Sequence, residues 1–247
     1  MSALILALVA GAVVGLALGG LGGGGSVLAV PALTYLLGLR PAEAITASLI
    51  IVTVTSVTAL AGHARDGNVA WRTGLLFAAA GVAPAMLTGA AAGHLPQAAL
   101  TVAFAVVASV AAMGMLRPAH TPDVGEVRTV KAGAAGAGLG AITGLLGVGG
   151  GFLAVPALVR VLRLPMRRAV GTSLLVITIN SLAALGARAG TAVDLDWAVI
   201  APFTAAAILG AWDGKRHAQR LTGDTLRRIF AYVLLAVAGL MLVDAFV

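Results

Sequence analysis

Two glycine tracts embedded in apolar sequence are the first places where this chain could do chemistry. They are Gly22-Gly23-Gly24-Gly25-Ser26 and Gly147-Val148-Gly149-Gly150-Gly151, followed downstream by Pro31 and Pro156 respectively. Glycine costs about 1 kcal/mol relative to alanine inside a helix, so each tract predicts a helix break. The helix that restarts after such a break exposes unpaired amides and the positive end of its dipole, and both attract anions.

We therefore expect the backbone at the two breaks to bind a small oxyanion. The half-helices are expected to begin near residues 25–27 and 150–152 and to meet near the middle of a membrane. Glycine also lets a ligand approach the backbone closely. The candidate binding residues in the tracts are Gly22, Gly23, Gly24, Gly25, Ser26, Val27, Gly147, Gly149, Gly150, Gly151 and Phe152.

Hydroxyl and amide side chains inside two other apolar runs complete the candidate site. Ser48 and Thr55 lie seven residues apart, as do Ser173 and Asn180, so each pair shares one helical face. Their hydrogens could donate to an anion, and Ser48, Ser173 and Asn180 join the candidate binding residues. The alternative is hydrogen bonding between helices, worth about 0.6 kcal/mol on average, and we favour it for the individual threonines.

Ionisable side chains are absent from the centres of the apolar runs. Such residues usually mark proton and cation pathways, so their absence argues against a carboxylate proton pump and against cation transport. No base, nucleophile or metal-ligand spacing stands out, so we expect neither an enzyme nor a metal or cofactor. A nucleotide loop is also a poor fit, because neither tract continues into Lys-Ser or Lys-Thr.

Membrane-spanning helices must position these residues. Of the 247 residues, 60% are hydrophobic and 10% are charged, whereas a soluble domain has roughly 25% charged residues. The long apolar runs predict helices, not barrel strands. The net charge of +7 is concentrated in short loops, as the positive-inside rule describes, so nucleic acid is not an expected partner. The runs fall at about 3–20, 26–38, 43–62, 73–93, 97–116, 132–147, 150–162, 168–187, 195–213 and 226–246.

The two halves of the chain repeat each other. Residues 11–62 align with 136–187 at a shift of 125, with about 23 identities in 52 pairs. The segment from Leu28 to Leu33 matches Leu153 to Leu158 without a break, including the proline. Small residues at every fourth position also align, and we assign them to close helix packing. They are Gly11, Gly15, Gly19, Gly136, Gly140 and Gly144.

Loop charge indicates that the halves are inverted. Placing basic loops in the cytoplasm gives the three full spans of each half opposite directions. The predicted fold is an all-α polytopic membrane protein of about ten helical segments, in two inverted repeats, each with a glycine-broken pair of short helices and three full spans. We assign residues 1–116 and 132–247 to the repeats and 117–131 to a cytoplasmic linker.

At the glycine tracts the chain resembles the sulfite exporter TauE/SafE family, also called the toluene sulfonate uptake permeases. The resemblance rests on the glycine-rich break with a downstream proline at Gly22–Pro31 and again at Gly147–Pro156, and it covers essentially the whole chain. It implies transport of sulfur-containing anions, such as sulfite and organosulfonates, across the cytoplasmic membrane. The first tract ends in Ser26 where the second has Gly151, so the halves need not contribute equally.

The expected function is secondary transport of a small anion, sulfite or an organosulfonate, across the inner membrane by alternating access. A passive anion channel and a membrane scaffold without transport are the alternatives. The expected partners are the anion and the lipid bilayer, and a homodimer is left open. Arg65 and Arg188 are assigned to topology more than to steering of anions.

Overall fold

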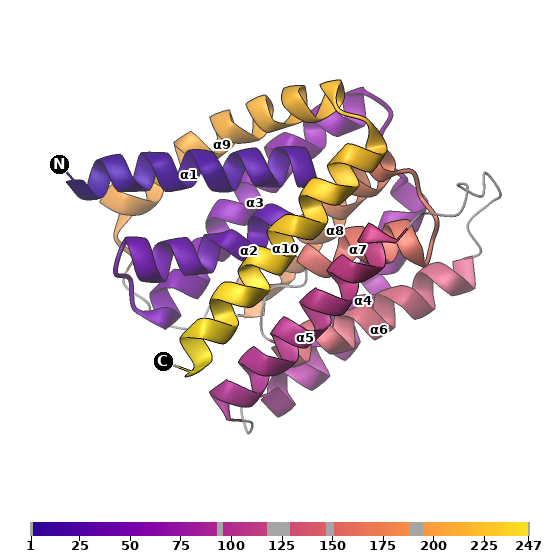
Figure 1. Ribbon diagram of the computed structural model, residues 1–247, viewed down its shortest axis with the longest axis horizontal. Helices are drawn as coiled ribbons and strands as arrows, with labels where there is room; N and C mark the ends of the chain where they lie inside the picture. Colours follow the sequence, from indigo (N-terminus) through magenta and orange to yellow (C-terminus); the bar gives the residue numbers. More distant parts are fainter. Residues whose placement is uncertain (1, 93–95, 118–128, 147–150, 188–194, 247) are drawn as a thin grey trace.

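The computed structural model describes residues 2–92, 96–117, 129–146, 151–187 and 195–246, and every regular element within these ranges is a helix (Figure 1). A short π-helical stretch at Ala32–Leu36 extends α2. The α-helices are α1 (Ser2–Leu21), α2 (Gly24–Pro31), α3 (Pro41–Arg65), α4 (Trp71–Ala92), α5 (Gln97–Leu116), α6 (Thr129–Leu146), α7 (Gly151–Arg160), α8 (Met166–Ala187), α9 (Trp197–Arg220) and α10 (Gly223–Phe246).

The ten helices coincide with the ten apolar runs, which confirms the predicted all-α polytopic fold. Five segments in the described chain are long and apolar enough to cross a membrane: Leu4–Leu21, Glu43–Arg65, Met166–Gly186, Trp197–Arg220 and Gly223–Val243. One detail differs from the expectation, because α1 is itself 20 residues long and only α2 of that pair is short. In addition, α6 begins at Thr129, inside the expected linker. The boundaries at 116 and 132 remain a prediction.

The backbone repeats the sequence duplication in detail. Gly38 and Arg163, which are 125 residues apart, both have positive φ angles, +68° and +53°. The turns around them close with equivalent bonds. The amide of Leu39 donates to the carbonyl of Leu33 at 3.1 Å, and that of Leu164 donates to the carbonyl of Leu158 at 3.0 Å. Each half therefore follows its short helix with the same turn.

The two halves pack closely against each other. The most extensive contacts join α1 with α9 and α4 with α6, so the first helix of each half packs on the fourth helix of the other. An added Cβ would lie 2.0 Å from the Ala207 carbonyl oxygen at Gly15 and 2.1 Å from the Gly81 carbonyl oxygen at Gly140. The predicted packing role is thereby confirmed for five of the glycines, Gly11, Gly15, Gly19, Gly136 and Gly140.

The central helices α3 and α8 are antiparallel, and their contacts locate a pseudo-two-fold axis. Ser56 bonds Thr178, while further along α3 His63 lies against Gly171. A two-fold axis that relates two antiparallel helices must be perpendicular to them. If these helices cross a membrane, the axis lies in the membrane plane, which is the geometry of an inverted repeat.

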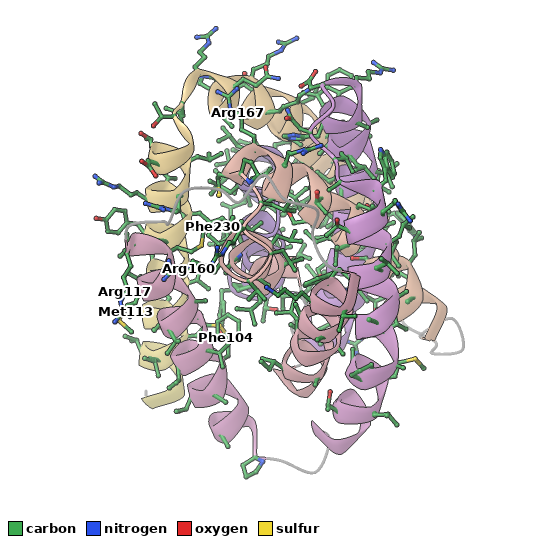
Figure 2. All side chains as sticks on the ribbon, turned by 90° about the vertical axis from the view of Figure 1, so that its right-hand side faces the viewer. Phe104, Met113, Arg117, Arg160, Arg167 and Phe230 are labelled. Atoms are coloured by element: carbon green, nitrogen blue, oxygen red, sulfur yellow. The ribbon has the colours of Figure 1, made fainter. Side chains whose placement is uncertain are left out.

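Helices α5 and α10 form a second antiparallel pair, in front of the centre in Figure 1. Phe104 of α5 and Phe230 of α10 are fully buried members of one apolar cluster, which also receives Leu153 and Val155 of α7. Figure 2 shows both rings on the inner side of this pair. The pair therefore covers the short helices on this side.

One end of the molecule gathers the basic loops. Asp66, just after α3, bonds Lys215 and Gln219 of α9, each at 2.7 Å. Arg167, at the start of α8, donates to the carbonyls of Gln219 and Leu221 at 2.8 and 3.2 Å. We call this the basic end. The basic connections from α3 to α4, from α7 to α8 and from α9 to α10 therefore lie on the same side.

Close approach of α1 to α9 makes the Gly15→Ala variant an informative stability test. The new methyl group would overlap the Ala207 backbone, and overpacking of this kind costs about 1–3 kcal/mol. We expect a lower unfolding midpoint of the purified protein in detergent. Gly138→Ala on α6 is the control, since nothing lies within 4 Å of that position. Equal midpoints for the two variants would contradict this account of the packing.

The absence of cysteine from the chain allows a clean test of sidedness. Arg40 and Arg216 are exposed and lie toward opposite ends of the helices. The positive-inside rule places the basic end in the cytoplasm. We expect an impermeant maleimide added to intact cells to label the Arg40→Cys variant and to leave Arg216→Cys unlabelled until the cells are opened. The reverse pattern would show that the orientation is wrong.

Candidate functional site

The break expected in the first glycine tract is present. Helix α1 ends at Leu21, Gly22 and Gly23 form a turn, and α2 begins at Gly24, one residue before the expected range. Gly22 adopts a φ of +70°, a conformation that side chains rarely allow. Gly24, Gly25, Ser26 and Val27 form the first turn of α2, where amides have no partner within the helix.

The turn presses against the other half of the protein. A Cβ on Gly22 would lie 2.4 Å from the Ser173 hydroxyl oxygen and 3.1 Å from the Val170 carbonyl oxygen. The structure therefore brings two predicted site residues together, Gly22 from the first repeat and Ser173 from the second. Ser173 donates its hydroxyl hydrogen to the Val170 carbonyl at 2.8 Å, and Ser48 likewise donates to Ile45 at 2.8 Å. In this state neither hydroxyl hydrogen is directed at a ligand.

The second tract is only partly described. Gly147, Gly149 and Gly150 lie outside the described residues. Gly151 and Phe152 open α7, although the Phe152 side chain is also outside the description. The interpretation of these five residues as ligands for an anion stays a prediction.

The two short helices do not aim their starts at one point, which corrects the expected geometry. The Gly22 turn, which leads into α2, lies beside Val170 and Ser173 in the first part of α8 and therefore toward the basic end. Helix α7 instead finishes toward that end. The Nε of Arg160, its last residue, lies 3.7 Å from a Cβ built on Gly114 near the end of α5 (Figure 2). Helix α5 ends on this side because it is antiparallel to α10, which starts at the basic end. The pseudo-two-fold axis turns one short helix over relative to the other, and their positive ends face opposite sides.

Hydroxyl groups gather at the level of the axis, where α3 crosses α8. The Thr178 hydroxyl lies 3.0 Å from that of Ser56, and Thr53 and Ser181 of the same helices are also buried. Thr55 and Asn180 occupy equivalent positions, 125 residues apart. Within the described chain, Thr55 Oγ1 and Asn180 Oδ1 are buried atoms without a hydrogen-bond partner. Such atoms are costly unless a ligand or water meets them.

Thr55 is a candidate that the sequence analysis assigned to helix contacts. The sequence held one signal that Thr55 could belong to the site. Thr55 aligns with Asn180, which is the most polar residue in the middle of any span. We now group the two residues as the axial pair. Asn180 is partly buried and Thr55 is fully buried.

A small pocket at the basic end adjoins the first break. It is lined by Gly20, His63, Asn68, Arg167, Val170, Lys215, Ala218, Gln219 and Leu226. Val170 also contacts the Gly22 turn, so the pocket and the break share a wall. The basic side chains at its rim are Arg167 and Lys215. The sequence analysis explained such charges only by membrane orientation. Arg65 is exposed and does not line this pocket, and Arg188 lies outside the described residues.

No three His, Asp or Glu side chains cluster as metal ligands in the part of the chain that the structure describes. The polar chemistry found there consists of hydroxyls, amides, helix ends and the basic rim.

Comparison with known proteins places these features in a family context. The family model for the sulfite exporter TauE/SafE matches residues 7–241. Two relatives from Xylella fastidiosa, strains 9a5c and Temecula1, are each named "Probable membrane transporter protein". Each is 35% identical over 245 residues, which is 95% of this chain and 93% of the relative. No solved structure matches.

A more distant relative comes from Bacillus subtilis and is named "Probable membrane transporter protein YunE". It is 27% identical over 206 residues, covering 72% of this chain and 74% of its own length. The similarity therefore extends over most of both halves.

The Gly22 turn can be tested with a matched pair of variants. Gly22→Ala combines an unfavourable positive φ with a clash against Ser173, whereas Gly38→Ala has a similar φ and open space around it. We expect Gly22→Ala to lose about 1–3 kcal/mol more of unfolding free energy than Gly38→Ala. Ser173→Gly added to Gly22→Ala should restore part of the loss. If Ser173→Gly restores no stability, the close contact between the Gly22 turn and Ser173 of α8 is contradicted.

Proposed function

Because this chain belongs to the sulfite exporter TauE/SafE family, we propose that it moves a small anion, sulfite or an organosulfonate, across the cytoplasmic membrane by alternating access. Family membership and the names of the relatives make it a multi-pass membrane transporter, a class of protein that is generally not enzymatic. The anion and the mechanism are the proposal.

The observation that carries the anion proposal is the neutral, partly unsatisfied polar layer at the axis. Asp, Glu, Lys and Arg are absent from the middle of the described spans, while hydroxyls and one amide meet where α3 crosses α8. In the axial pair, Thr55 Oγ1 has no protein partner and can donate its hydrogen to an anion, whereas the unpaired Asn180 Oδ1 only accepts and calls for a donor such as water. A cation would favour carboxylates at this depth. Hydroxyl and amide hydrogens suit an anion.

The inverted halves support alternating access. In such repeats, each half can adopt the conformation of the other, which closes one end of the path and opens the opposite end. At the basic end, Asp66 joins the turn after α3 to Lys215 and Gln219 of α9. We propose that these bonds hold the cytoplasmic side closed and separate when the site opens to the cytoplasm.

The axial pair provides the test of the proposed function. In liposomes containing the purified protein, Thr55→Val and Asn180→Leu should each lower sulfite flux by about tenfold, the effect of losing about 1.4 kcal/mol of interaction with the anion. Thr58→Val is the control, because the Thr58 hydroxyl already donates within its own helix, 2.8 Å from the Thr55 carbonyl oxygen.

The same liposomes distinguish the alternatives. Counterflow of labelled sulfite against an unlabelled gradient is expected of a carrier with a site that opens alternately to each side. Rapid flux without counterflow would indicate a passive channel. Absence of flux for sulfite and for small sulfonates would reject the proposed function and favour a scaffold.

A further inference from the structure

His63 is a buried histidine with one ring nitrogen unused. It lies in the last turn of α3, lines the pocket at the basic end and is only 5% exposed. Its Nε2 lies 3.1 Å from the carbonyl oxygen of Gly19. Its Nδ1 is buried and has no hydrogen-bond partner in the described chain.

The bond to Gly19 determines what Nδ1 can do. A carbonyl oxygen only accepts hydrogen bonds, so Nε2 must carry the hydrogen. In the neutral ring Nδ1 is then left with a lone pair and no hydrogen. A bare anion has nothing to donate to this atom. The unpaired position therefore fits a proton.

The charges around the pocket come from several helices. Lys215 of α9 bonds Asp66 and also donates to the Gly62 carbonyl, each at 2.7 Å. Arg167 of α8 lies at the rim. With His63 neutral, Lys215, Arg167 and Asp66 together carry one net positive charge.

That excess charge opposes protonation of His63 as long as the pocket holds no anion. An anion at the rim would offset it and favour a second positive charge on the ring. Proton and anion would then each strengthen the binding of the other, as linkage requires of any two ligands with favourable coupling.

We propose that the open rim of this pocket binds one anion, beside Lys215 and Arg167, and that His63 Nδ1 takes up one proton with it. The proton comes from solution, no covalent bond other than the new N–H is formed, and the Nε2–H bond to Gly19 is retained. The added charges cancel. This inference rests on the proposed function and extends it, because it makes His63 the residue that couples anion movement to protons.

The location suits such coupling. Gly19 is in the last turn of α1, three residues before the Gly22 turn, and Gly20 lines the pocket. A change in the charge of His63 therefore changes the electrostatic potential next to the first break. The residue 125 positions further on is Arg188, so the second repeat has no equivalent histidine.

The test counts protons during binding of methanesulfonate, a fully ionised anion that brings no proton with it. Calorimetric titrations of the purified protein in buffers of different ionisation enthalpy give the number of protons taken up per anion. We expect close to one near pH 8 for the unmodified protein. In His63→Gln the amide can still donate to Gly19, but it cannot accept a proton, so uptake should fall to near zero and affinity by about tenfold.

His217→Gln is the matched control. His217 is exposed, its Nδ1 lies near Asp213 of its own helix, and it does not line the pocket. It should keep both the proton count and the affinity of the unmodified protein. A thermal melt of each variant verifies folding.

The outcomes separate this inference from the proposed function. Methanesulfonate binding without proton uptake by the unmodified protein overturns the role of His63 even if the variants fail to fold, and leaves sulfite transport standing. Proton uptake that persists in His63→Gln has the same meaning. If sulfite and methanesulfonate are neither bound nor transported, both proposals fail.

Discussion

A backbone amide or carbonyl inside a bilayer must find a partner in the protein, because lipid provides none. This constraint explains why the described chain is built of helices and why the interruption at Gly22 and Gly23 occurs where it does. The turn is covered directly by Val170 and Ser173 of α8. A break facing lipid would leave its polar groups unpaired. Placing it against the other repeat means that the turn is covered only when both halves are assembled.

The same dependence appears in the packing. Helix α1 lies on α9 and α6 lies on α4, with glycines allowing backbone contact in both pairs. In a bilayer the hydrophobic effect does not hold helices together, and close packing of small residues takes its place. Each repeat thus supplies a helix that completes the other, while α3 and α8 meet through hydroxyls at the axis. The arrangement joins two inverted units without a charged residue in the middle of the described spans.

The positions of the helices and of the first break could be predicted from local sequence. The relative orientation of the short helices could not. The helices follow the apolar runs, and the shift of 125 residues reappears in the turns at Gly38 and Arg163. The tract at Gly22 correctly indicated a break. Its orientation relative to α7 did not follow, because glycine content says where a helix stops and not which way the next one points. The sequence did not single out His63 and favoured helix contacts for Thr55, because an unpaired ring nitrogen or hydroxyl can be recognised only when every neighbour is placed.

The Asp66–Lys215 ion pair has a consequence for the energetics of the transport cycle. The positions 125 residues away are Thr191 and Ala90, which carry no charge and cannot form a matching ion pair. Although the two halves share one backbone pattern, a carrier that works by the proposed alternating access would have its two faces held shut by unequal contacts. Such a carrier would not divide its time evenly between its two orientations. Its idle population would favour one face even when no gradient drives it.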